Sequence, residues 1–240
     1  MSPLPQYNPK LKQIFWPDLP EILISVRRSK QANRLSLRVS RLHRTVTITG
    51  PHTVDIQQFL DFVAQKRPWI IGHFADLPQP TAVKIGSYLP FLGHELLIAH
   101  GANRKVTLTN NAIELPANNR SAGRQIQAFL KVQAREHLAQ ASDKYSKKLG
   151  LSYARLTLRD TKSRWGSCSS QGHLMYSWRL IMAPVDVLEY VAAHEVAHLA
   201  EMNHSSKFWA VVEQLFGDYN AQKNWLRTEG VKLHHYQFQD

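Results

Sequence analysis

The chain has 240 residues, 43% of them hydrophobic and 20% charged, so it is long enough to bury a sizeable core and is not disordered by composition. Thirty Lys and Arg side chains against 18 Asp and Glu give a net charge of +12, which favours polyanionic partners such as nucleic acids or nucleotides. The single cysteine, Cys168, excludes an internal disulfide and any multi-cysteine zinc site, and no signal peptide or transmembrane stretch is recognisable, so we expect a soluble, cytoplasmic protein with no membrane partner.

Residues 1–20 contain five prolines without apolar periodicity, which predicts a Pro-rich tail. From Glu21 onward, apolar and polar residues alternate, as is typical of half-buried antiparallel strands. A helix is predicted over about 54–74, with Pro68 kinking or splitting it. Strands are predicted near 22–26, 35–39, 46–48, 88–92, 95–99 and 105–109. Residues 21–118 are therefore expected to form a basic, β-rich N-terminal domain.

A run of basic residues without any acid lies between Glu21 and Asp55. Its seven members are Arg27, Arg28, Lys30, Arg34, Arg38, Arg41 and Arg44. Such a run is either a solvated strand face or a surface that binds a nucleic acid or nucleotide. We take Arg27, Arg28, Arg34 and Arg38 as the candidate polyanion-binding residues.

The second half of the chain is predicted to be an α+β catalytic domain over residues 119–240. Apolar residues recur every three or four positions from Ile126 to Leu149, and Gly150 ends this long amphipathic helix. Two strands follow at 156–160 and 174–180, with a loop or bulged strand at 164–170 between them. A nearly all-apolar, buried helix begins at Pro184, and further helices are predicted over 205–216 and 219–229.

The most informative motif lies on the buried helix and reads His194-Glu195-Val196-Ala197-His198. Residues i and i+4 of an α-helix differ by about 40° in azimuth, so both imidazoles can bind one cation, with Glu195 beside it. This pattern is typical of zinc hydrolases, in which zinc lowers the pKa of a bound water and the glutamate acts as general base. The alternative is that these side chains are buried without a metal and make only hydrogen bonds in the core. Two histidines and a glutamate would then be costly to desolvate.

Zinc needs a third protein ligand, and the best candidate is His204, six residues after His198 and just past the expected helix end. Competing third ligands are Glu201, Glu213, His173, His234 and His235. The reaction also needs a donor to the transition-state oxyanion. Candidate stabilisers are Arg164, Tyr176, Tyr190 and Tyr236. If strand 156–160 or 174–180 lies at a sheet edge, an extended peptide could pair with it.

Several runs together resemble the YgjP-like metallopeptidase family over about residues 22–230. They are Val26-Arg27-Arg28-Ser29, Lys66-x-x-Trp69-Ile70, Arg164-Trp165-Gly166-Ser167-Cys168-Ser169, Trp178-Arg179-Leu180-Ile181, Ala183-Pro184, Tyr190-Val191, His194-Glu195-x-x-His198-Leu199, Asn203-His204-Ser205 and Phe208-Trp209. The resemblance implies a zincin-like domain with zinc bound by His194, His198 and His204. The H-E-x-x-H-x₅-H spacing is also similar to that of SprT-like and WLM-type proteases, which act on proteins crosslinked to DNA. Ser177 replaces the asparagine usual in the family, and Glu201 replaces the glycine of metzincins.

Three functions follow from these features. The first is a zinc metallopeptidase whose peptide or protein substrate is cleaved with Glu195 as general base. The second is a metal-dependent nucleotide (UTP) pyrophosphatase, an activity attached to the family's name, although the chain has no Gly-rich phosphate loop and no carboxylate cluster for magnesium. The third is a nucleic-acid-binding adaptor with a structural metal, against which the presence of Glu195 argues.

Overall fold

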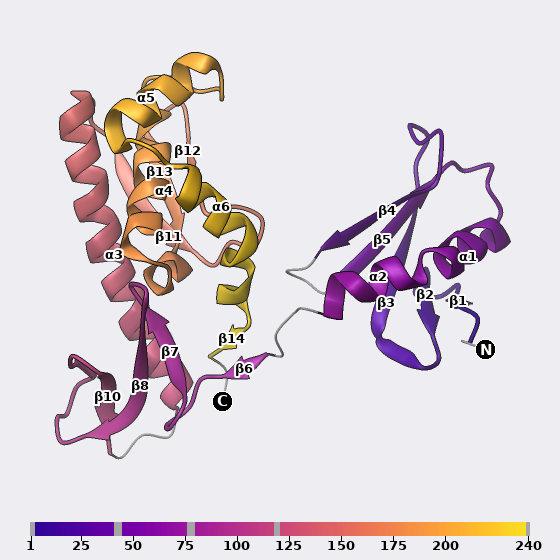
Figure 1. Cartoon of the computed structure of the whole chain (residues 1–240), viewed down its shortest axis with the longest axis horizontal. Helices are drawn as coiled ribbons and strands as arrows, with labels where there is room; N and C mark the ends of the chain where they lie inside the picture. Colours follow the sequence, from indigo (N-terminus) through magenta and orange to yellow (C-terminus); the bar gives the residue numbers. More distant parts are fainter. Residues whose placement is uncertain (1–2, 41–44, 76–79, 118–120, 239–240) are drawn as a thin grey trace. The chain divides into compact units, whose positions relative to one another are not determined.

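The structure is a computed structural model that describes residues 3–40, 45–75, 80–117 and 121–238. It divides into two compact units, Met1–Pro78 and Gln79–Asp240 (Figure 1), each with a hydrophobic core of its own. Helices and several small sheets alternate along the chain, and the predicted α+β class is confirmed. No described helix is long and apolar enough to span a membrane.

The first unit is a five-stranded sheet packed against two helices. Its elements are β1 (Gln6–Asn8), β2 (Gln13–Trp16), β3 (Leu19–Arg28), β4 (Ser36–Ser40), β5 (Thr45–Gly50), α1 (Ile56–Gln65) and α2 (Arg67–Ala75). In the order β1-β2-β3-β5-β4, the pair β3 and β5 is parallel and the others are antiparallel. The prediction of antiparallel strands is therefore wrong for this pair, because alternation shows which side chains face the core but not the direction of the strand.

The N-terminal segment is part of this sheet, in contrast to the predicted tail. The side chains of Ile14 and Trp16 on β2 are fully buried, and the guanidinium of Arg67 lies 5.1 Å from the Trp16 ring centroid. Pro9 and Pro17 fall in turns on either side of β2, where a missing backbone donor costs no ladder hydrogen bond. Two of the five prolines thus mark turns, whereas Pro20 lies within β3.

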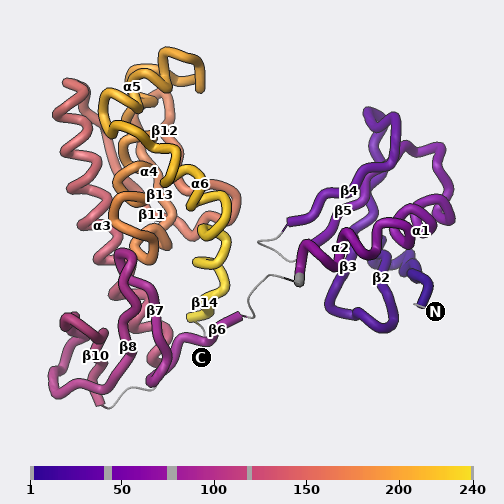
Figure 2. The backbone as a smooth tube through the Cα atoms, in the orientation of Figure 1, coloured from indigo at the N-terminus to yellow at the C-terminus, as the bar shows by residue number. Residues whose placement is uncertain are grey.

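The second unit contains the remaining helices and three small sheets, ordered β7-β8-β10-β9, β11-β13-β12 and β14-β6. Its strands are β6 (Thr81–Ala82), β7 (Tyr88–Phe91), β8 (His94–Gly101), β9 (Thr107–Leu108), β10 (Ala112–Pro116), β11 (Arg155–Arg159), β12 (Gly166–Cys168), β13 (His173–Ser177) and β14 (Tyr236–Gln237). Its helices are α3 (Ala122–Leu149), α4 (Val185–Ala197), α5 (Ser206–Phe216), α6 (Asn220–Thr228) and the 3₁₀ helices η1 (Trp178–Met182) and η2 (Gly230–His234). Although far apart in sequence, β6 and β14 lie side by side (Figure 2).

The structure draws the boundary between the units earlier than the sequence analysis does. The predicted boundary after residue 118 lies outside the described residues, and β7, β8 and β10 before it belong to the second unit. Their buried side chains, among them Phe91, Ile98 and Ile113, share one core with α3 and α4. Alternation predicts β7 and β8 but not β10, which follows the strand predicted at 105–109, and it carries no information about which core the strands join.

The long helix and the buried helix form where the apolar periodicity places them. Gly150 ends α3 in the left-handed conformation, with φ of 75°, which costs glycine no Cβ clash. Nine of the thirteen residues of α4 are buried, and α4 packs against α3, α5 and β12. The backbone of α4 is therefore fixed by contacts on several sides.

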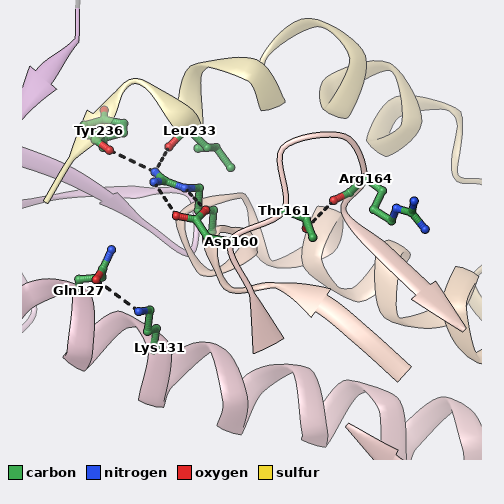
Figure 3. A network of polar contacts seen from close by, with 8 residues as sticks. Gln127, Lys131, Asp160, Thr161, Arg164, Leu233 and Tyr236 are labelled. Atoms are coloured by element: carbon green, nitrogen blue, oxygen red, sulfur yellow. Dashed lines mark hydrogen bonds and ion pairs between the residues drawn. The ribbon is translucent and has the colours of Figure 1, made fainter. Parts of the chain in front are cut away.

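One predicted strand is shorter than expected, because the chain turns into η1 at Trp178. The turn buries Arg179, which donates to the carboxylate of Asp160 and to the backbone carbonyls of Leu233 and Tyr236 (Figure 3). This network joins the end of β11 to the C-terminal segment. The alternating pattern predicts a strand through Leu180 because it contains no information about these buried hydrogen bonds of Arg179.

Candidate metal centre and active site

The H-E-x-x-H motif lies at the C-terminal end of α4. His194 and Glu195 belong to the last turn of the helix, and His198 is its C-cap residue. The ring centroids of His194 and His198 are 5.2 Å apart, as expected for side chains one helical turn apart on the same face. Because most of α4 is buried in the core, these side chains project from a rigid element.

His204 joins this pair from the turn between α4 and α5. Ser205 caps α5 by accepting a hydrogen bond from a backbone amide in the first turn, and this sharp start directs the preceding residue back toward α4. Nε2 of His204 lies 3.1 Å from Nε2 of His194. The potential ligand atoms of His194, His198 and His204 all lie within 4.8 Å of one another.

These three imidazoles fit a divalent cation such as zinc. Zinc–nitrogen bonds of about 2.0–2.1 Å in a tetrahedral site place neighbouring nitrogens roughly 3.3 Å apart. Nδ1 of His198 donates to the carbonyl of Glu201 at 2.9 Å, which leaves the lone pair on Nε2 available. Burial lowers the pKa of His194 to about 3 and also lowers the pKa of His198. Both rings are therefore neutral at pH 7, the form that binds a metal.

The competing third ligands lie elsewhere. The backbone carbonyl of Glu201 accepts the hydrogen bond from His198. Glu213 is exposed on α5, and His173 lies on β13. The ring of His234 packs on Trp165 at 5.3 Å. Among the described residues, the three-histidine cluster is the only group of three or more His, Cys, Asp or Glu side chains close enough to share a metal.

Glu195 is almost completely buried beside this cluster, with 5% of its surface exposed. Burial raises the pKa of its carboxyl to about 8, and the positive charge of Arg164 opposes the shift. Gly166 on β12 packs directly against the side chain of Glu195, since a Cβ at this position would lie 2.5 Å from Oε1 of Glu195. The sequence analysis quoted Gly166 without a role, although a glycine inside a short strand can mark such a close approach.

An aromatic wall, which the sequence analysis did not identify, borders the histidines. Phe208 stacks on His198 with ring centroids 4.4 Å apart, and Trp209 stacks on His204 at 5.7 Å. Tyr219 stacks on Trp209 at 5.2 Å. These rings fix the imidazole planes and exclude water from one side of the site. Phe208 and Trp209 belong to a run that resembles the family, but an aromatic pair on an amphipathic helix is by itself typical of core packing.

The four candidate oxyanion stabilisers lie in different surroundings. The ring of Tyr190 on α4 lies 6.0 Å from that of His194, and Arg164 is exposed, with its charge acting to lower the pKa of Glu195. Tyr176 is fully buried, and its hydroxyl pairs with that of Ser142 at 3.0 Å. Tyr236 lies on β14, where burial and the charge of a β8 glutamate raise the pKa of its hydroxyl. The surroundings of Arg164 and Tyr190 favour them over Tyr176 and Tyr236.

The candidate polyanion-binding arginines all lie in the first unit and are exposed. Arg27 and Arg38 pair with Thr49 and Thr47 on the solvent face of the sheet. Arg28 instead donates to backbone carbonyls of residues 51, 52 and 54 and lies 5.1 Å from the Phe59 ring centroid, which indicates a structural role. Arg34 precedes β4, Arg41 and Arg44 lie outside the described residues, and polyanion binding stays a prediction.

Comparison with known proteins identifies the family. The family model described as YgjP-like, metallopeptidase domain, matches residues 33–229, well over half of the chain. The chain belongs to the YgjP-like metallopeptidase family. The YgjP-like match runs from the first unit to the end of α6 and includes all three histidines of the cluster. It confirms the resemblance seen in the motifs, and membership implies a catalytic metal.

Among solved structures, this YgjP-like chain is similar to the crystal structure of the metallopeptidase zymogen of Pyrococcus abyssi abylysin. The two chains are 21% identical, and the match covers 39% of this chain and 95% of that one with a TM-score of 0.35. No curated protein sequence matches the chain.

Proposed function

We propose that the protein is a zinc-dependent peptidase that uses Glu195 as general base. The observation that carries this proposal is a cluster of three imidazoles beside a buried carboxylate. A structural zinc site is closed by four protein ligands, whereas a catalytic site typically has three and keeps one position open. A buried carboxylate with a strongly raised pKa next to such a cluster is costly for stability and is typical of functional sites.

The residues of the chain divide the chemistry among them. A bound metal supplies Lewis-acid chemistry, which polarises the peptide carbonyl and makes water more acidic. Glu195 accepts a proton from the attacking water and transfers it to the leaving amine. Arg164 and Tyr190 are the proposed donors to the developing oxyanion.

The sheet offers an edge on which a peptide substrate can bind. In the order β11-β13-β12, β12 is an edge strand. Trp165 accepts a backbone hydrogen bond from Ser177, and Ser169 donates one to His173. The alternation of an antiparallel ladder therefore directs the backbone groups of Gly166 and Cys168 toward the open edge. An extended peptide that pairs with β12 would pass directly beside Glu195.

Replacing Gly166 with alanine tests this close contact. The new Cβ would lie 2.5–2.7 Å from Oε1, Cγ and Cδ of Glu195, so the carboxylate must move. A misplacement of about 1 Å costs on the order of 10²-fold in rate, and we expect such a loss of peptide cleavage with metal content unchanged. The matched control is Gly72→Ala, where a Cβ meets nothing within 4 Å. Cleavage by Gly166→Ala at the wild-type rate would contradict the assigned position of Glu195.

Removal of the metal tests the proposed function itself. Chelation should abolish cleavage of an unfolded protein, and about one equivalent of zinc per chain should restore it. The measurement is the cleavage rate against the zinc content of the same samples, with UTP hydrolysis assayed in parallel.

The two alternative functions give different results in this experiment. Zinc-dependent UTP hydrolysis without peptide cleavage would contradict the proposal in favour of a nucleotide pyrophosphatase. A zinc-loaded protein that is inert toward both substrates would favour an adaptor with a structural metal. The pyrophosphatase alternative lacks a magnesium site among the described residues, since no carboxylate cluster is found there.

We also propose that the protein is located in the cytoplasm. Cys168 is a free cysteine on β12, and burial raises the pKa of its thiol to about 11. The thiol is therefore protonated and unreactive at neutral pH. A free thiol of this kind suits a reducing compartment.

A further inference from the structure

A basic groove with a volume of about 470 Å³ lies over the sheet β11-β13-β12. Arg155 and Arg159 of β11, Arg164 before β12 and His173 of β13 contribute to its lining. The described residues that line it include serines and threonines but no Asp or Glu. The opposite, apolar face of the same sheet packs in the core with α4. The groove therefore belongs to the outer face of the sheet, with Arg164, whose charge also acts on Glu195, at its margin.

The register of the strands gathers the basic side chains at the two ends of the groove. At one end Arg155 pairs with His173. At the other end Arg159 pairs with Ser177, and Ser177 donates a backbone hydrogen bond to the residue directly after Arg164. Four residues of strand separate these ends, or about 13 Å at 3.3 Å per residue. The groove thus presents two positive ends along an extended path.

The carboxylate of Asp160 does not cancel this charge. Asp160 follows Arg159 in the chain, but its carboxylate accepts two hydrogen bonds from Arg179, at 2.7 and 3.2 Å. Figure 3 shows the Arg164 side chain directed away from Asp160. Since Asp160 pairs with the buried guanidinium of Arg179, the basic side chains of the groove can bind a negatively charged ligand.

The groove extends across the sheet from Arg155 and Arg159 of β11 to Ser167 of β12, the edge at which the proposed peptidase would bind its substrate. Side chains of an extended peptide alternate between the two faces of a sheet. A peptide paired with β12 therefore directs every second side chain to the outer face, where Ser167 and Arg164 lie, and the others toward Glu195. We propose, given the peptidase function proposed above, that this groove binds carboxylate side chains of the substrate and selects polypeptides with acidic residues at alternate positions around the cleaved bond.

A nucleic acid is the competing occupant, because guanidinium groups bind phosphate as well as carboxylate. Proteins that bind single strands also stack bases on aromatic side chains, and no Phe, Tyr or Trp is found among the described residues that line this groove. The groove is instead continuous with a strand edge that suits a polypeptide. An acidic polypeptide is therefore the better occupant.

The test measures binding separately from cleavage, with the zinc-loaded Glu195→Gln protein. The probes are a fluorescent peptide with glutamate at every second position, its glutamine counterpart, and a single-stranded thymidine oligonucleotide of the same length. At low salt we expect the acidic peptide to bind about tenfold more tightly than the glutamine peptide, as several partly exposed ion pairs allow. Adding Arg155→Gln and Arg159→Gln should reduce this preference to about twofold or less. The matched control, Arg104→Gln with Lys105→Gln in an exposed loop of the same unit, should keep it.

Each of the other outcomes overturns one specific statement. Equal binding of the two peptides, or a preference that survives Arg155→Gln and Arg159→Gln, would contradict the groove as the acidic subsite. An oligonucleotide that binds more tightly than the acidic peptide, and loses affinity in the same variant, would replace it with a nucleic-acid site. Cleavage by the wild-type protein without charge preference contradicts the groove alone. No cleavage of either peptide, with the binding preference intact, contradicts the peptidase function alone.

Discussion

Replacing Glu195 with glutamine is expected to lower the rate of peptide cleavage by about 10²- to 10⁴-fold, the range that a general acid–base group typically contributes. Glutamine keeps the shape of the side chain beside Gly166 but cannot accept a proton. The zinc content should not change, because the three imidazoles are untouched. The measurement is the cleavage rate of zinc-loaded protein, with zinc determined on the same samples.

The control for this change is Glu213→Gln, which removes an exposed carboxylate from α5. It should leave cleavage within about twofold of the wild type, as expected for a surface substitution. Two results would contradict the role of Glu195. Near-normal cleavage by Glu195→Gln would assign the proton transfer to another group, and loss of zinc together with activity would make Glu195 a metal ligand.

The geometry of the histidine cluster is the part of the site that the sequence predicts best. His194 and His198 are related by the helical period alone, so their shared face follows once the helix is recognised. The helix itself is recognisable because it is apolar on nearly every side. His204 requires one more step, the turn after α4, for which the capping residue Ser205 is a local signal.

The surroundings of Glu195 could not be predicted in the same way. The contact between Gly166 and Glu195 joins a strand to a helix that comes well after it in the chain, and no local period relates them. The same is true of the groove, in which Arg155, Arg159 and His173 meet through the parallel register of β11 and β13. Alternation predicts the exposed face of each strand, but only the pairing brings the faces together.

The division into units shows a related limit. The strands β7 and β8 have the same alternating pattern as β3 and β5, so sequence analysis groups them into one β-rich half. Their core partners, α3 and α4, come later in the chain. In residues 3–20, the apolar pair Ile14 and Trp16 determines the outcome, because burying two large side chains contributes more than the prolines in the flanking turns oppose.

Replacing His204 with alanine is expected to lower zinc affinity by more than about 100-fold, the upper end of what the loss of a mere supporting partner costs. His204 is the exposed member of the cluster, whereas His198 is buried and His194 is largely so. Its removal therefore empties no space in the core, and the metal-free variant should unfold at nearly the wild-type temperature. The measurement is the zinc concentration that raises the unfolding temperature, since a ligand stabilises the folded state according to its affinity.

The comparison that gives this result its meaning is His94→Ala, which removes an exposed histidine of β8 from the same unit and should leave the zinc response unchanged. If His204→Ala responds to zinc like the wild type, a different side chain completes the site, and Glu213 and His173 are the next to replace. If His204→Ala loses both zinc and peptide cleavage while its fold is intact, the third imidazole is required for the metal. The two histidines of α4 alone then do not hold it, and the turn that Ser205 sets after the helix is as necessary to the site as the helix itself.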